Sequence, residues 1–127
     1  MSMDKRFEKA ISLFNIGNYF ESHDVLEELW LETDNEYKDL YQGVIQSAVA
    51  FYLSGEHRYK GAYKMFERSK RNLSKYKQIA QGINVRKLIS DSTKFFESQS
   101  FQSGIYSGSA SLEFPKIEYY PDPKFTH

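Results

Sequence analysis

Apolar residues recur from the N-terminus to about Ser98 with the spacing of amphipathic helices. The first set falls at intervals of three and four residues, which predicts one face of a helix from about Asp4 to Ile16: Phe7, Ala10, Ile11 and Phe14. Gly17 then suits a helix C-terminus, because glycine accepts a positive φ without a Cβ clash. Asn18 and Glu21 have the spacing of a capping box, so a second helix is predicted from Asn18 to about Leu31.

A third helix is predicted to begin near Thr33 or Asp34, where Glu36 is placed to cap it. Its residues 44–53 read VIQSAVAFYL and are apolar almost all round. Such a helix is usually central and covered on several sides. The third helix is therefore expected to lie in the middle of the fold.

Two further helices are expected, one from about His57 to Tyr76 and one that begins at Asn84, a good N-cap residue. The outer face of the fourth helix is basic: Lys60, Lys64, Arg68, Lys70, Arg71 and Lys75. No pair of segments has a strand pattern strong enough to propose a sheet. The predicted class is all-α, a compact bundle of about five helices.

The chain changes character after Ser98. The stretch SQSFQSGIYSGSAS is rich in Ser and Gly, as flexible linkers are, and the last residues, LEFPKIEYYPDPKFTH, contain three prolines and cannot form a helix. The aromatic residues of this last segment favour an extended tail across the domain or across a partner, with simple disorder as the alternative: Phe114, Tyr119, Tyr120 and Phe125. We therefore divide the chain into a helical bundle, residues 1–97, and a linker with a C-terminal tail, residues 98–127.

Composition narrows the classes of function. Lys plus Arg and Asp plus Glu both number 17, and a net charge of zero argues against nucleic-acid binding dominated by phosphate contacts. The absence of cysteine excludes disulfides, thiolate metal sites and cysteine nucleophiles. The N-terminus lacks the apolar run of a signal peptide, and no apolar stretch approaches the roughly 20 residues of a membrane span. We expect a soluble, cytoplasmic protein.

The stretch HDVLEELW, residues 23–30, places a histidine and a carboxylate among residues that should face a core. On a helical wheel at about 100° per residue, His23 lies about 20° beyond the apolar Trp30, and Glu27 lies about 40° beyond His23. An unpaired buried carboxylate costs several kcal/mol. Glu27 is therefore expected to be buried and paired with His23, one turn away on the same face.

Gln42 and Gln46, one turn apart on the third helix, complete the predicted site. The short connection makes the second and third helices antiparallel neighbours, so this pair is expected to face His23 and Glu27 beside Trp30. Tyr19 and Phe20 would add an aromatic wall. Three interpretations remain open: a structural hydrogen-bond network, a ligand pocket, or a metal site held by His23 and Glu27.

Complete catalytic motifs are absent from the sequence. It contains no phosphate-binding glycine loop, GxSxG, HExxH or second His-Glu pair, and a catalytic zinc usually has three protein ligands. The sequence favours a non-enzymatic module that binds a small ligand or a protein, or that assembles. A metal-assisted hydrolase built on His23 and Glu27 is the alternative. The cofactor, the ligand and the partner are unknown, and a homo-oligomer stays open.

Four blocks of residues carry a resemblance to a known family. The first is Phe14-Asn15-x-Gly17-x-x-Phe20-Glu21-x-His23-Asp24-x-x-Glu27-x-x-Trp30, and the others are Tyr41-Gln42-Gly43-Val44-Ile45-Gln46-x-Ala48, Gly61-Ala62 with Asn72-Leu73, and Gly82-Ile83-Asn84-Val85-x-x-Leu88. They resemble the family catalogued as domain of unknown function 309, in which aspartate is commoner than asparagine at the position of Asn84. The resemblance covers about Phe7 to Phe96. It implies an all-helical bundle in which the His23, Glu27, Trp30, Gln42 and Gln46 set matters together, and it implies no activity.

Overall fold

The protein folds as a bundle of five helices with a very small sheet, which confirms the predicted all-α class. The computed structural model describes residues 4–98 and 114–120. The elements, in chain order, are α1 (Lys5–Asn15), α2 (Tyr19–Leu31), α3 (Lys38–Gly55), α4 (Tyr59–Leu73), β1 (Ile79–Ala80), β2 (Ile83–Asn84) and α5 (Val85–Phe96).

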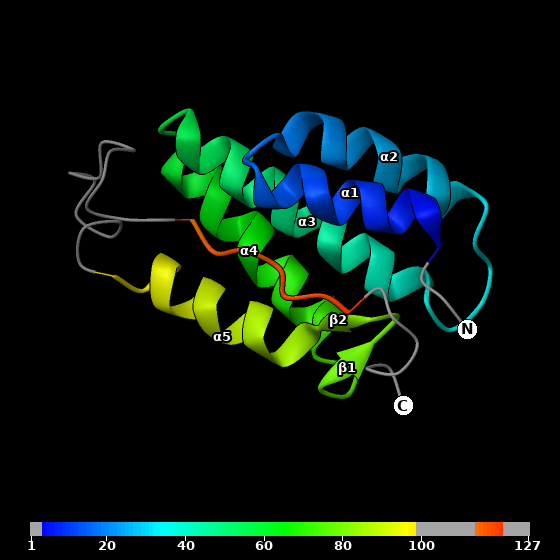
Figure 1. Ribbon diagram of the computed structural model, residues 1–127. Helices are drawn as coiled ribbons and strands as arrows, with labels where there is room; N and C mark the ends of the chain where they lie inside the picture. Colours follow the sequence, from blue (N-terminus) through cyan, green and yellow to red (C-terminus); the bar gives the residue numbers. More distant parts are fainter. Residues whose placement is uncertain (1–3, 99–113, 121–127) are drawn as a thin grey trace.

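Helix α3 occupies the middle of the fold, as its apolar sequence predicts. It packs against α2 on one side and α4 on the other, α1 pairs with α2, and α5 packs on α4 (Figure 1). Ten consecutive residues around its centre, 43–52, include only Val49 and Tyr52 outside the buried class. No helix in the described part of the chain is long and apolar enough to cross a membrane.

The predicted helix starts follow from local side-chain caps. Asn18 Oδ1 accepts a hydrogen bond from the Glu21 N–H at 3.5 Å, and Asn84 Oδ1 accepts one from the Lys87 N–H at 3.0 Å. Gly17, between α1 and α2, has a φ of 86°, which only glycine adopts without strain. These features confirm the predicted boundary between α1 and α2 and the start of α5.

The prediction that the third helix begins near Thr33 or Asp34 is wrong, because α3 begins at Lys38. Thr33 lies just after α2, and its hydroxyl donates back to the carbonyl of Leu29 in α2 at 2.8 Å. Asn35 accepts a hydrogen bond from the Tyr37 N–H at 2.9 Å. These local side-chain bonds hold the polar segment in a turn and compete with the helix.

A small sheet was not expected from the sequence. Strands β1 and β2 form an antiparallel hairpin in which Ile79 pairs with Asn84 and Ala80 pairs with Ile83. The two turn residues, Gln81 and Gly82, both have positive φ values, which is typical of a tight hairpin turn. Strands of two residues are too short to show an alternating pattern.

Residues 114–120, which we name the C-terminal strap, lie across the bundle beside α5 (Figure 1). Ile117 is 2% exposed and belongs to the core, and Tyr119 forms an antiparallel bridge with Ile83. The expected extended tail across the domain therefore holds for these residues, while Phe125 lies outside the described part. The division of the chain into residues 1–97 and 98–127 stays a prediction.

Gly43 provides a test of how closely α3 and α4 pack. A Cβ atom on Gly43 would lie 2.7 Å from Cδ2 of the buried Leu73 and 3.3 Å from Cβ of Asn72. We expect Gly43→Ala to lower the free energy of unfolding by about 1–2 kcal/mol, because overpacking outweighs the gain in helix propensity. Urea denaturation measures this change.

Gly61→Ala is the matched control, because its Cβ would meet Leu53 at an ordinary 3.5 Å. We expect it to leave stability unchanged or to raise it by up to about 1 kcal/mol. Equal effects of the two substitutions would contradict the close approach at Gly43.

Candidate functional site

His23 and Glu27 contact each other on α2, as their spacing predicts. His23 Nε2 lies 3.4 Å from Glu27 Oε2, and His23 Nδ1 lies 3.2 Å from Asp24 Oδ1. Carboxylates therefore face both ring nitrogens of the imidazole. The His23 side chain is 29% exposed, so this group is accessible from solvent.

The expectation that Glu27 is buried is wrong, because its side chain is 55% exposed. The buried face of α2 is formed by Tyr19, Ser22, Leu26 and Leu29. Ser22 occupies this face because its hydroxyl donates to the carbonyl of Ala10 on α1 at 2.8 Å. This polar contact rotates the buried arc of α2 away from Glu27, and a wheel based on apolar residues alone does not account for it.

Trp30 joins the end of α2 to the start of α3. Lys38 Nζ lies 4.2 Å from the centroid of the Trp30 ring and donates to the carbonyl oxygens of Trp30 and Thr33 at 3.3 and 3.0 Å. An ammonium group over an aromatic ring and at the C-terminus of a helix is favourable on both counts. The contacts of Trp30 with Lys38 therefore stabilise the turn between the two helices.

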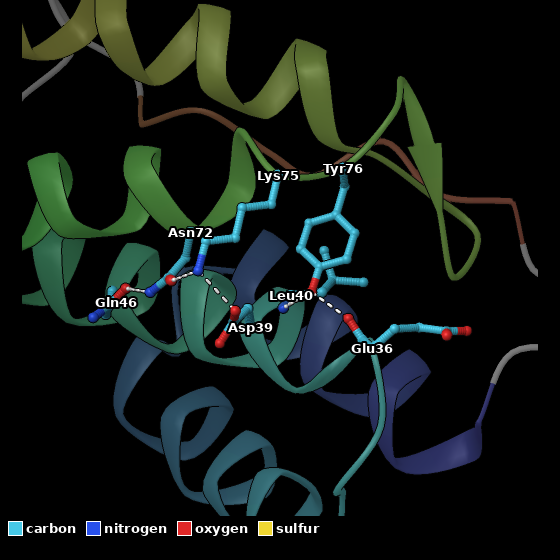
Figure 2. Close-up of polar contacts among 7 residues, drawn as sticks. All are labelled: Glu36, Asp39, Leu40, Gln46, Asn72, Lys75 and Tyr76. Atoms are coloured by element: carbon cyan, nitrogen blue, oxygen red, sulfur yellow. Dashed lines mark hydrogen bonds and ion pairs between the residues drawn. The ribbon is translucent and has the colours of Figure 1, made fainter.

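Gln46 points to α4, away from the His23 and Glu27 pair. Its Oε1 accepts a hydrogen bond from Asn72 Nδ2 at 2.8 Å (Figure 2). Gln42, one turn earlier on α3, is half-buried. The structure therefore keeps the His23 and Glu27 contact but places Gln46 in a different interface, so the four side chains do not form one cluster between α2 and α3.

Polar contacts between α3 and α4 form a row that we name the polar seam. The seam consists of the Gln46 bond to Asn72, the Ser69 hydroxyl donating to the Gly43 carbonyl at 2.7 Å, and the Lys75 ion pair with Asp39 at 2.7 Å. The sequence analysis missed it. The available signal was the pair of polar residues Ser69 and Asn72, three positions apart on the fourth helix and outside its basic face.

Tyr76 caps α3 from the turn that follows α4. The α3 N-cap residue, Tyr37, makes no side-chain capping bond. The Tyr76 hydroxyl accepts from the Leu40 N–H at 2.8 Å and donates to the Glu36 carbonyl at 2.6 Å (Figure 2). The pKa of Tyr76 is raised, mainly because the hydroxyl is partly buried. The neutral hydroxyl therefore favours folding below about pH 10, and this contribution is lost as pH rises through the folded-state pKa.

Tyr19 and Phe20 face opposite environments and do not form one aromatic wall. The Tyr19 ring lies in the core, 5.1 Å from Phe14 and 5.9 Å from Phe51 between centroids. Phe20 is 59% exposed. Adjacent positions on a helix are about 100° apart, so one ring packs inward while the next faces outward.

An exposed group of rings lies where α2 meets α3, and we name Phe20, His23 and Tyr52 the aromatic patch. The Phe20 centroid is 6.4 Å from His23 and 6.1 Å from Tyr52, which is 41% exposed. The sequence analysis counted Tyr52 within the apolar segment 44–53 of the third helix and so missed its part in this surface. Exposed, adjacent aromatic side chains are a feature of interaction sites.

Charge is divided between the outer helices. Helix α2 contains four acidic residues and no Lys or Arg, whereas α4 contains five basic residues and one acidic residue. The two helices lie on different sides of α3 (Figure 1). The net charge of zero therefore conceals an acidic surface beside the aromatic patch.

Metal ligands do not assemble around His23 in the described residues. Among residues 4–98 and 114–120, no group of three or more His, Asp or Glu side chains is placed to hold an ion. His23 and Glu27 alone offer two ligands, fewer than the three of a usual catalytic zinc. A metal-assisted hydrolase would therefore require a further ligand.

Substitutions at Glu27 and Gln46 distinguish the exposed from the buried part of the predicted site. We expect Glu27→Ala to change the free energy of unfolding by less than about 0.5 kcal/mol, since exposed ion pairs contribute little. Gln46→Ala leaves the Asn72 amide without its partner and is expected to cost about 1–3 kcal/mol. Chemical denaturation of both variants measures the difference, and a larger loss for Glu27→Ala would contradict the observed exposure.

Replacement of Tyr76 tests the cap on α3. We expect Tyr76→Phe to lower the free energy of unfolding by about 1–2 kcal/mol, because the Leu40 N–H and the Glu36 carbonyl lose their shared partner. Tyr52→Phe is the control, since Tyr52 is exposed. Equal stability of the two variants in thermal denaturation would show that the cap contributes nothing.

Comparison with known proteins agrees with the motifs in the sequence. The model of the family described as "Domain of unknown function (DUF309)" matches residues 7–65, which include most of α1, all of α2 and α3, and the first part of α4. Comparison with curated proteins and with solved structures found no match. Over residues 7–65, the chain is therefore similar to the DUF309 family.

Proposed function

We propose that the protein is a non-catalytic binding module and that its outer α2 face binds a basic, amphipathic helix of a partner protein. The observation that carries this proposal is the exposed pair of rings, Phe20 and Tyr52, beside acidic side chains. Exposed aromatic groups with a polar surround are typical of protein interaction sites.

The shape of this surface favours a protein partner over a small molecule. Small-molecule sites are concave and bury most of the ligand surface, whereas Phe20 and Tyr52 are open to solvent. Leu31, also exposed, lies 11 positions after Phe20 on α2, which corresponds to about 16 Å along the helix axis. A partner helix of about three turns spans this distance and can contact apolar groups at both ends.

Charge favours a basic partner. Asp24 and Glu27 are exposed between Phe20 and Leu31, and Glu21 and Glu28 are exposed on the adjoining side of α2. Lys or Arg side chains along a partner helix would complement these carboxylates. Exposed complementary charges raise the association rate and set the orientation, and salt screens them.

Selection from a displayed library of helical peptides tests this function and requires no identified partner. We expect the selected peptides to carry apolar residues on one face and Lys or Arg on its flanks. Their dissociation constants, measured by fluorescence anisotropy, should rise at least tenfold for Phe20→Ser combined with Tyr52→Ser, because these rings form the apolar contact. Asp24→Asn with Glu27→Gln should reduce the salt dependence of binding.

Ile16→Ser is the matched control, because Ile16 is an exposed apolar residue in the turn after α1. This variant should bind the peptides as the natural sequence does. Peptides that bind the Phe20 and Tyr52 double variant with unchanged affinity, or a selection that yields acidic peptides, would refute the proposed surface.

A further inference from the structure

The C-terminal strap lies along β2 and meets it through one antiparallel bridge. The Asn84 N–H donates to the Glu118 carbonyl at 2.9 Å, and the Tyr120 N–H donates to the Gly82 carbonyl at 2.7 Å. These bonds flank the antiparallel bridge between Ile83 and Tyr119. The edge of β2 therefore binds the strap through its backbone, which is how extended peptides add to a sheet.

Asn15, at the end of α1, provides a second set of hydrogen bonds to the strap backbone. Its Nδ2 donates to the Ile117 carbonyl at 2.9 Å, and its Oδ1 accepts from the Ile117 N–H at 2.7 Å. One side-chain amide thus satisfies both backbone groups of a single strap residue. This arrangement fixes the position of the strand, whatever side chain it carries at that residue.

Two strap side chains supply the sequence preference. Ile117 is almost completely buried, and the Phe114 ring lies 5.4 Å from Phe51 and 5.1 Å from Phe95 between centroids. The groove therefore selects an aromatic residue followed three positions later by a branched apolar residue. We name the groove between α1, α5 and the β2 edge the strand groove.

We propose that the strand groove is a docking site for a second copy of this chain, which supplies its own residues 114–120 in exchange. All the contacts described above come from residues 114–120, and none requires that the strap and the groove belong to one chain. A second copy carries the identical segment, so it satisfies the same backbone bonds and the same two side-chain positions. The connecting residues 99–113 are rich in Ser and Gly, the composition of a linker.

An empty groove is unfavourable, so the groove requires a strap, either its own or that of a second copy. Without the strap, the Asn84 N–H and the Gly82 carbonyl form an unpaired sheet edge, and Ile83 loses its cover.

The linker determines which occupant prevails. Because residues 99–113 connect the strap to α5 in the same chain, the effective concentration of that strap is of millimolar order, and it fills the groove in dilute solution. Exchange becomes dominant when the internal strap is defective or when the protein concentration approaches that range. Exchange of an identical element is a common route to dimers.

Two complementary full-length variants test the exchange. Ile117→Asp places a charge in the buried strap position and leaves the groove intact, whereas Asn15→Asp puts a carboxylate against the Ile117 carbonyl and leaves the strap intact. We expect each variant alone to be a monomer of 14.9 kDa by light scattering. An equimolar mixture should give a one-to-one complex of twice that mass, and a mixture of two folded variants that stays monomeric would overturn the proposal.

A protease site placed within residues 99–113 of the natural sequence gives a second test that needs no destabilising substitution. After cleavage, the C-terminal fragment should remain bound and should exchange with a labelled peptide of residues 112–122, but not with the same peptide carrying Ile117→Asp. A fragment that leaves and a labelled peptide that fails to bind would overturn the proposal. A peptide that binds while the mixed variants stay monomeric would also overturn it and would assign the groove to a strand from a different protein.

Discussion

The burial of α3 between α2 and α4 is the constraint on which the other helices depend. A helix covered on several sides must satisfy its polar groups within the protein, because water does not reach them. Helix α4 supplies Asn72 for Gln46 and Ser69 for the Gly43 carbonyl. The turn after α4 supplies Tyr76 for the N-terminus of α3. Polar residues of α4 therefore serve as hydrogen-bond partners for buried polar groups of α3. The absence of a side chain at Gly43 lets Leu73 of α4 approach α3 closely.

The central position of α3 also determines where a binding surface can form. Because α3 supplies much of the core, α2 needs only one narrow face for packing and leaves a broad face exposed. That face combines carboxylates with Phe20 and borders Tyr52 at the C-terminal end of α3. A charged helix that also exposes a large aromatic residue gains nothing in stability from that residue. This conflict between stability and exposure is the physical argument for an interaction role.

Sequence-based predictions succeeded where the interacting residues are close in sequence and failed where they are far apart. Caps at Asn18 and Asn84 and the apolar period of α3 are local, so the helices and the central position of α3 were correctly predicted. The contact of His23 with Glu27 is also local and was found. The exposure of Glu27 was not predicted, because a hydrogen bond from the Ser22 hydroxyl to α1 sets the rotation of α2. The direction of Gln46 and the cap from Tyr76 depend on residues 26 and 36 positions away, and no pattern within one helix contains that information.

The same long-range contacts show that the folding unit extends beyond the family match. Residues 7–65 include all of α3 but end within α4, before Ser69, Asn72 and Tyr76. A chain cut at residue 65 would leave Gln46 and the first turn of α3 without their partners, and it would expose the side of α3 that Leu73 covers. Ile117 and Phe114 then cover the apolar surface between α1 and α5. The matched segment therefore describes the part of the fold that carries the acidic α2 surface, while the residues that stabilise its central helix lie in the remainder of the chain.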